Sequence, residues 1–193
     1  RGAAVVAMGS LGAGRLNAGS DLDLIVICDP QDTDQSEGQK PLPVRVYYAR
    51  LTQALVTALT APMGEGRLYE VDMRLRPSGR QGPVATTLAA FRDYQMNEAW
   101  TWEHLALTRA RVVAGGGDLA ASVEAVRCAV LAAKAGRAAI LTDTADMRLR
   151  IFASKATDGA FGAKVGPGRL QDIELVAQAA ALTCGSPARA VSA

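Results

Sequence analysis

Two aspartates and a glycine-serine pair lie close together near the start of the sequence. Residues 8–29 read MGSLGAGRLNAGSDLDLIVICD, in which Gly9-Ser10 ends one apolar run and Asp21 and Asp23 lead into another. A strand alternates its side chains between two faces and rises about 3.3 Å per residue. We therefore expect the two carboxylates on one face, about 7 Å apart at Cα. Leucine and valine at 22, 24 and 26 would be buried on the other face.

Two carboxylates this close repel each other, and a divalent cation offsets that repulsion. Magnesium takes hard oxygen ligands and is commonly held by one or two carboxylates together with substrate phosphates. The Gly9-Ser10 turn offers backbone N–H groups and a hydroxyl to phosphate oxygens. The order of these parts favours a metal-assisted phosphate site. The Asp-x-Asp pair alone favours an ordinary strand with two exposed aspartates at its mouth, but the Gly9-Ser10 turn and the downstream features favour the phosphate site.

A second informative segment, residues 66–77, reads GRLYEVDMRLRP and alternates strictly between apolar and polar residues. This pattern predicts a half-buried strand. Asp72 lies on its polar face between Glu70 and Arg74, where it could complete the site formed by Asp21 and Asp23. The alternative is a solvated edge strand whose mixed charges suppress pairing with other chains.

The rest of the chain predicts mostly helices. Residues 30–43 contain three prolines and predict a loop. Apolar residues at 44, 47, 48, 51, 55 and 59 predict a helix that packs on the sheet and ends before Pro62. A helical region is expected from Leu88 through residues 91–115, one or two helices over 119–142, a loose segment over 159–168, and a helix over 170–182. Three glycines at 115–117 place a domain boundary there, which gives domains 1–117 and 118–193.

Composition and motif searches exclude several classes of protein. The 193 residues are 49% hydrophobic and 21% charged, so the chain is globular, and no apolar run is long enough to span a membrane. The net charge is +2, and no stretch of basic residues is interleaved with aromatic ones, so the sequence does not indicate nucleic-acid binding. No G-K-[ST] motif occurs, and the glycines at 9, 12 and 14 do not form G-x-G-x-x-G.

The cysteines and the histidine indicate no metal or disulfide framework. The three cysteines are widely spaced, so we expect buried, reduced thiols. His104 is the only histidine, and its helical surroundings favour a structural role. The chain starts and stops inside apparent elements, so we expect it to be a fragment of a longer polypeptide.

The Gly-Ser, spacer and Asp-x-Asp pattern resembles the nucleotidyltransferase superfamily typified by DNA polymerase beta. The resemblance narrows when longer blocks are included. GSLG at 9–12, LN-x-x-SDLDL at 16–24, LYEVDMRLRPSG at 68–79, residues 91–113, and DIELVAQ at 172–178 together resemble the glutamine synthetase adenylyltransferase family. Two departures are Gly9-Ser10, where the family often has Gly-Lys, and Leu175, where its DIEF-type motif has phenylalanine.

The resemblance implies an α+β fold, with a polymerase-beta-like nucleotidyltransferase domain, a mixed sheet with flanking helices, followed by part of an all-helical domain. It implies a cytoplasmic bacterial enzyme that transfers AMP from ATP to a tyrosine hydroxyl of glutamine synthetase. Two Mg²⁺ ions would assist, and a PII-type signalling protein would regulate the full-length protein. The implied catalytic and metal-binding residues are Asp21, Asp23 and Asp72. The implied nucleotide-binding residues are Gly9, Ser10, Ser20, Arg74, Arg76 and Arg109.

Several alternatives stay open within and beyond this family. The block at 97–113 resembles the C-terminal, AMP-attaching half of the family's proteins, but the AMP-removing half is homologous. Uridylyl transfer to a PII-type protein would use the same superfamily chemistry. A catalytically silent docking module with the same fold is the alternative from another class. Arg109 and Arg111 lie two residues apart, so only one of them would face phosphates while the other forms an ion pair or lies on the surface.

Overall fold

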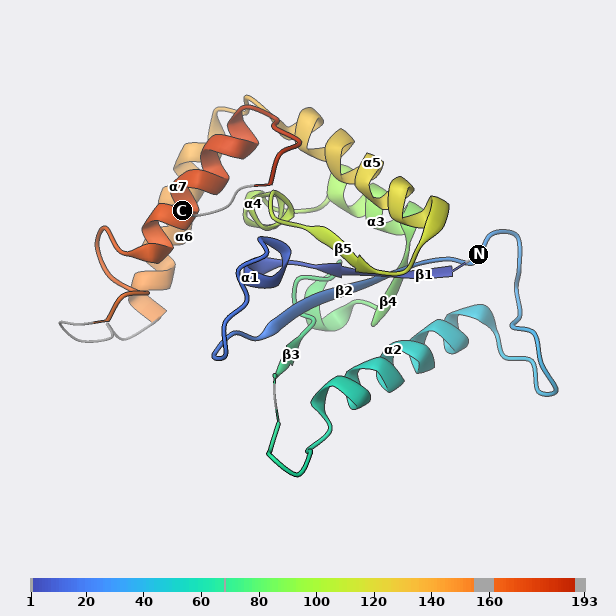
Figure 1. Ribbon diagram of the computed structural model, residues 1–193. Coiled ribbons are helices and arrows are strands. Elements are labelled where there is room, and N and C mark those ends of the chain that lie inside the picture. Colours follow the sequence, from blue (N-terminus) through green and yellow to red (C-terminus); the bar gives the residue numbers. More distant parts are fainter. Residues whose placement is uncertain (1, 68, 155–161, 190–193) are drawn as a thin grey trace. The chain divides into compact units, whose positions relative to one another are not determined.

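A computed structural model describes residues 2–67, 69–154 and 162–189 of the chain (Figure 1). The fold is α+β, with a mixed sheet and flanking helices, as the sequence predicted. Contacts within the chain divide it into two compact units. The first comprises residues 1–98 and 110–126, and the second comprises residues 99–109 and 127–193. The predicted boundary at residue 117 falls at the first residue of helix α5 (Gly117–Lys134) and stays a prediction.

The first unit contains a five-stranded sheet in which β2 (Leu22–Asp29) is the best-connected strand. It pairs antiparallel with β1 (Gly2–Ala7), which in turn pairs antiparallel with β5 (Arg111–Ala114). Along its other edge β2 pairs in parallel with β3 (Val71–Asp72) and then with β4 (Ala85–Thr87). Of these two parallel neighbours, β3 meets the aspartate-bearing end of β2, because it pairs with Leu22 and Asp23, whereas β4 pairs with the far half of the strand.

Apolar side chains at the beginning of β2 are buried and hold this part of the strand in place. Leu22, Leu24 and Val26 are buried as predicted, and Ile25 and Ile27 are buried as well. Leu22 and Leu24 form a cluster with Ala7, against which five partly buried side chains pack. These are Val5, Leu11, Leu16, Tyr69 and Val71. The cluster flanks Asp23 on both sides along the chain, so its packing sets where that carboxylate lies.

Helices α1 (Gly9–Gly12), α2 (Val44–Thr60) and α3 (Leu88–Asn97) lie within this unit, as does the first part of α5. Helix α2 contacts β3 and β4, and α3 contacts β2 and β4. The bounds of α2 match the prediction, and the loop over 30–43 is confirmed. The predicted buried face of α2 is wrong in part. Tyr48 and Thr52 are buried, whereas Tyr47 and Leu51 are more than 40% exposed.

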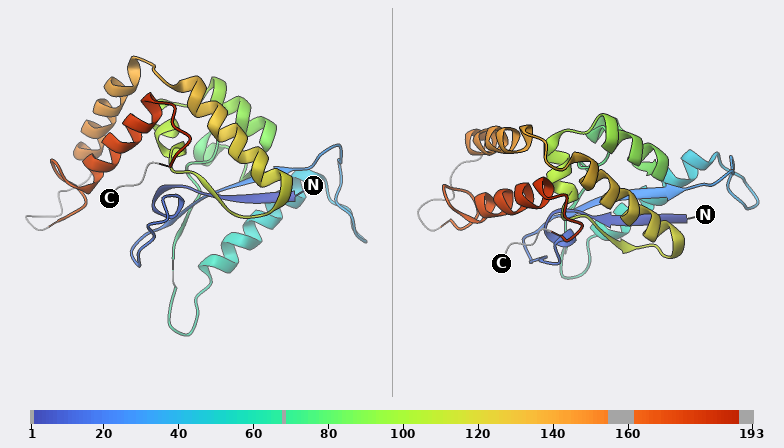
Figure 2. Two further views of the ribbon diagram at one scale, coloured as in Figure 1. Left: turned by 45° about the horizontal axis from the view of Figure 1, so that its top comes forward. Right: turned by 90° about the horizontal axis from the view of Figure 1, so that it is seen from above.

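The second unit is helical and contains α4 (Thr101–Leu107), α6 (Ala139–Ser154), α7 (Leu170–Thr183) and the C-terminal part of α5. Helices α6 and α7 lie side by side in both views of Figure 2. Arg148 of α6 donates two hydrogen bonds to the carboxylate of Asp172 of α7, at 2.7 and 2.8 Å. The helices expected over 119–142 and 170–182 are confirmed. Of the loose segment expected over 159–168, residues 159–161 lie outside the described residues, and 162–168 form bends and turns.

Two sequence predictions of secondary structure are wrong. Among the described residues of the alternating segment 66–77, only the two residues of β3 form a strand, and residues 73–76 turn away from the sheet. Residues 111–114, which were expected to be helical, form strand β5 because their backbone pairs with β1. The tryptophans at 100 and 102 are 70% and 39% exposed, so Leu105 and Leu107 supply the buried bulk of α4.

The expectations for membrane spans, the histidine and the cysteines are confirmed only in part. None of the helices in the described ranges is both long and apolar enough to cross a bilayer. His104 is buried in α4. The three cysteines are free thiols, but only Cys28 is buried, while Cys184 is exposed. Burial raises the pKa of the Cys28 thiol to about 11, with a further contribution from the charge of Asp29.

Truncation of a leucine beside Asp23 tests the importance of this packing. Leu24 is 3% exposed, so Leu24→Ala should lower the free energy of unfolding by about 2–5 kcal/mol through lost burial and a residual cavity. Leu51→Ala, in the same unit but 42% exposed, is the matched control and should cost less than about 1 kcal/mol. Urea denaturation of both variants measures the difference. Equal midpoints would show that the cluster does not stabilise the strand.

Candidate active site

The Gly9-Ser10 turn lies directly against the carboxylate of Asp23. Strand β1 ends at Ala7, and the amide of Met8 donates to the carbonyl oxygen of Asp23 at 2.9 Å. Gly9 has φ +52°, and a Cβ built on it would lie 2.2 Å from Oδ2 of Asp23. A side chain here would require both a strained backbone and displacement of the carboxylate. Glycine is therefore the residue that allows the turn and the aspartate to approach each other.

Parallel pairing brings Asp72 alongside Asp23. Leu22 pairs with Val71 and Asp23 with Asp72, and the amide of Leu22 donates to the carbonyl of Glu70 at 2.8 Å. Residues in register on neighbouring strands project to the same face of a sheet. The side chain of Asp72 is only 15% exposed, so it does not point into bulk solvent. The two strands thus place two of the three predicted carboxylates side by side.

Asp21 reaches the same place from just before β2. It lines an open cavity of about 370 Å³ whose wall also includes Asp72 and three arginines. The full lining is Asp21, Glu70, Val71, Asp72, Met73, Arg74, Arg76 and Arg80. This volume lies in the range of small-molecule sites in proteins. Charged side chains of both signs line it, which suits a ligand that carries phosphates and metal ions.

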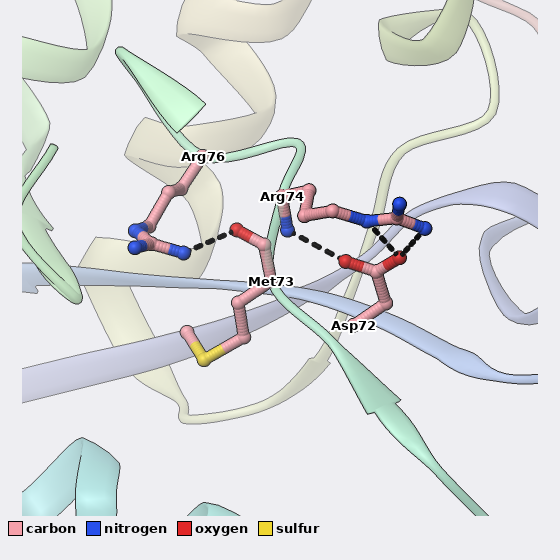
Figure 3. A network of polar contacts seen from close by, with 4 residues as sticks. All are labelled: Asp72, Met73, Arg74 and Arg76. Atoms are coloured by element: carbon pink, nitrogen blue, oxygen red, sulfur yellow. Dashed lines mark hydrogen bonds and ion pairs between the residues drawn. The ribbon is translucent and has the colours of Figure 1, made fainter. Parts of the chain in front are cut away.

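Arg74 neutralises Asp72 with a set of short hydrogen bonds (Figure 3). Its backbone amide donates to Oδ1 at 2.8 Å, its Nε donates to Oδ2 at 2.6 Å, and its Nη2 forms an ion pair with the same oxygen. Burial disfavours the charged form of Asp72, but the hydrogen bonds and charge of Arg74, with a contribution from Arg80, outweigh it and lower the Asp72 pKa. The pKa of Arg74 is raised, first by Asp72 and also by Asp23 and Asp21. The Arg74 guanidinium therefore interacts with all three carboxylates.

The donor set suits a hard divalent ion, but the three aspartates do not converge on one point. Within the described residues, no group of three or more His, Cys, Asp or Glu side chains lies close enough to hold a single metal ion. Asp72 uses both of its carboxylate oxygens to bind Arg74. An ion shared by Asp23 and Asp72 would thus compete with Arg74 for the carboxylate of Asp72, although each oxygen keeps a further lone pair. The in-register pair of carboxylates remains a chemically suitable place for it.

The other predicted nucleotide-binding residues have more varied surroundings. Ser20 donates from its hydroxyl to Oδ1 of Asn17 at 2.9 Å, which closes the turn before Asp21. Arg76 uses its guanidinium to bind backbone carbonyl groups, among them that of Met73 at 2.8 Å (Figure 3). Arg109 is buried in the helical unit and forms an ion pair with Glu174 at 3.2 Å. That is the ion-pair role that the sequence left open for one of the two neighbouring arginines.

Two further arginines of the first unit lie near the site: Arg111, the other member of the pair considered from the sequence, and Arg80, which the sequence patterns missed. Arg111 lies on β5, and its Nε donates to the carbonyl of Gly12, the last residue of α1, at 3.0 Å. Arg80 lies in the loop after β3 and lines the cavity with Asp72. The contact between Arg111 and Gly12 was not expected, because residues 111–114 were predicted to be helical. The pairing of 111–114 with β1 brings Arg111 to the turn.

The close approach at Gly9 yields a testable expectation. Gly9→Ala combines an unfavourable φ with a 2.2 Å clash, so it should lower the free energy of unfolding by about 1–3 kcal/mol. Gly19→Ala, in the loop of the same site, is the control, because its Cβ would meet nothing nearer than 3.9 Å. Thermal and urea unfolding of both variants provide the comparison. A Gly9→Ala protein as stable as Gly19→Ala would contradict this geometry.

The hydrogen bonds from Arg74 to Asp72 lead to a second prediction, which concerns the pKa of Asp72. Because the folded pKa of Asp72 is below its unfolded value of 3.8, its contribution to stability is complete above that pH and is lost as the pH falls through the folded pKa. Arg74→Ala should raise the Asp72 pKa towards its ordinary range. Arg67→Ala, which removes only the exposed pair with Glu70, should leave it unchanged. Carboxyl ¹³C titration by NMR measures both, and an unchanged Asp72 pKa in Arg74→Ala would refute the assignment.

Sequence comparison finds relatives that match most of this chain. Relatives from Rhizobium meliloti and Mesorhizobium japonicum are 51% and 49% identical over 191 and 180 residues, which is 98% and 93% of this chain. A relative from Xanthobacter autotrophicus is 51% identical over 177 residues, or 91% of the chain. Each of these is named a bifunctional glutamine synthetase adenylyltransferase/adenylyl-removing enzyme. The chain spans only 18–19% of the length of these relatives.

The family profile described as glutamate-ammonia ligase adenylyltransferase matches residues 1–126. That match includes β1 to β5, the Gly9 turn and all three aspartates. Because it extends over more than half of the 193 residues, the chain belongs to the glutamate-ammonia ligase adenylyltransferase family.

Proposed function

We propose that this chain provides the catalytic site that transfers AMP from ATP to a tyrosine hydroxyl of glutamine synthetase. The observation that supports this most directly is the pairing of Asp23 with Asp72 on adjacent parallel strands, next to the Gly9 turn. The names of the relatives, which contain glutamine synthetase adenylyltransferase, supply the substrate class. We further propose that the reaction takes place in the bacterial cytoplasm and that a PII-type protein regulates the full-length enzyme.

The residues divide the work of binding and charge neutralisation. Asp21, Asp23 and Asp72 would hold two Mg²⁺ ions, with Arg74 moving from Asp72 towards the phosphates. When bound, Mg²⁺ would neutralise phosphate charge and lower the pKa of the attacking hydroxyl. Gly9 and Ser10 would bind triphosphate oxygens through backbone amides and a hydroxyl. The tyrosine oxygen attacks the α-phosphorus in line while its proton is released to solvent, the bond between the α-phosphorus and the α,β-bridging oxygen breaks, and pyrophosphate leaves.

Positioning and electrostatics would dominate this chemistry, as in other phosphoryl transfers. The cavity beside Asp21 and Asp72 contains arginines that can compensate the charge of the leaving pyrophosphate. Among the three arginines that the sequence suggested, Arg74 has the best support, because its charge already interacts with the three carboxylates. Ser20 is proposed to stabilise the turn that presents Asp21.

The reverse reaction is the second candidate, because the relatives' name includes an adenylyl-removing activity. Incubation with unmodified glutamine synthetase and labelled ATP tests attachment, and incubation with AMP-modified glutamine synthetase and phosphate tests removal. Transfer in the first assay alone supports the attaching half. Absence of Mg²⁺-dependent ATP binding in calorimetry would favour a docking module instead.

Loss of one carboxylate provides the decisive test. Asp23→Asn keeps the size of the side chain but removes a charge from the site, so AMP transfer should fall about a thousandfold or more. Asp29→Asn is the matched control at the opposite end of β2, and its activity should stay close to wild type. Transfer of labelled AMP to glutamine synthetase is measured for both, with thermal unfolding to verify the fold. Near-wild-type transfer by Asp23→Asn would require the proposal to be abandoned.

A further inference from the structure

The loop after β3 is held in shape by the side chain of Arg76. This 73–82 loop comprises Met73 to Gly82 and includes a short 3₁₀ turn (Gly79–Gln81). All three guanidinium nitrogens of Arg76 donate to backbone carbonyl oxygens of the loop. The distances are 2.8 Å to Met73, 3.3 Å to Gly82 and 3.3 Å to Arg80. Arg76 thus joins the first and last residues of the loop and also holds the backbone of Arg80.

Tight backbone packing restricts the same loop. A Cβ on Gly82 would lie 1.9 Å from the carbonyl oxygen of Pro77, so the backbone at these two residues is in close contact. Pro77 is buried, and Ser78 has φ +59°, a left-handed conformation that is uncommon for serine. Such a conformation persists when neighbouring contacts enforce it. The Arg76 bonds are contacts of this kind.

Arg80 has a different environment from Arg76. Its backbone carbonyl is held by Arg76, whereas its side chain is exposed and lines the cavity with Asp21, Asp72 and Arg74. Its charge is near enough to Asp72 to contribute to that residue's low pKa. A cation that faces this cavity and is fixed at its backbone is well placed to bind a polyanionic ligand.

We propose that Arg80 binds the β- and γ-phosphates of the nucleotide, and that Arg76 is the positioning residue that holds the 73–82 loop so that Arg80 faces the cavity. This inference rests on the proposed function and adds a residue that the sequence pattern did not indicate. It also changes the role of Arg76 from a phosphate ligand to a backbone clamp. The two roles respond differently to lysine. A phosphate contact tolerates a point charge, but one ammonium cannot reproduce three divergent bonds from a planar guanidinium.

Equilibrium binding to the full chain tests the division of roles. Mg·ATP, Mg·pyrophosphate and AMP are titrated by calorimetry against the wild type and the variants Arg80→Ala, Arg80→Lys, Arg76→Ala and Arg76→Lys. Arg80→Ala should weaken ATP and pyrophosphate about ten- to a hundredfold and change AMP affinity less than about twofold. Arg80→Lys should recover most of the loss. Both Arg76 variants should weaken ATP binding, without recovery by lysine.

Hydrogen exchange separates a clamp from a ligand. The amides of Gly79, Gln81 and Gly82 bond within the loop, so both Arg76 variants should exchange them faster, while Arg80→Ala should not. Gly82→Ala, which disturbs the loop without removing an arginine, should reproduce the Arg76→Ala pattern. Wild-type exchange and wild-type ATP affinity in Arg76→Lys would overturn the clamp. Unchanged ATP affinity in Arg80→Ala would overturn the phosphate contact.

The same experiment distinguishes this inference from the proposed function. If the variants respond as expected but the wild type transfers no AMP to glutamine synthetase, the proposed function fails and the roles of Arg76 and Arg80 stand. If the wild type transfers AMP while Arg80→Ala binds ATP normally, only the inference fails. If the wild type binds neither ATP nor pyrophosphate, both fail.

Discussion

Repulsion between like charges is the constraint on which the site depends. The parallel pairing of β3 with the first residues of β2 places Asp72 beside Asp23, and Asp21 lines the cavity next to Asp72. Neighbouring carboxylates disfavour each other's ionisation unless a cation compensates their charge. In this structure Arg74 supplies that cation through bonds to both oxygens of Asp72. The arginines after β3 are therefore part of the same electrostatic unit as the aspartates.

The sequence was sufficient for the elements whose local pattern and tertiary role agree. Strand β2 combines an apolar run with a polar start, α2 is periodic and stops before a proline, and the 30–43 loop has no periodicity. The aspartates at 21 and 23 were identified because their spacing suits the binding of a divalent cation. The family resemblance then connected residues 21, 23 and 72 across 48 intervening positions, which no local pattern could have done.

The errors arose where tertiary contacts outweigh local pattern. Residues 73–76 alternate as a strand would, but Arg76 bonds the carbonyl groups of the loop and turns the chain away. Residues 111–114 continue a helical sequence, yet their backbone pairs with β1. On α2, Thr52 is buried in place of Leu51 because its hydroxyl donates to the carbonyl of Tyr48 at 2.9 Å and so satisfies its own polar group. These hydrogen bonds cannot be predicted from the local sequence pattern.

The short β3 strand also determines where the polypeptide can change in length. Its register is set by the hydrogen bond from the amide of Leu22 to the carbonyl of Glu70, while Met63 and Gly66 bond to each other in a separate turn upstream. Insertions or deletions around that turn would alter an exposed loop and leave the aspartates aligned. A deletion of one residue between Glu70 and Asp72 would turn the carboxylate to the opposite face of the sheet, because side chains alternate with a period of two. Natural length variation in this region should therefore be confined to the upstream turn.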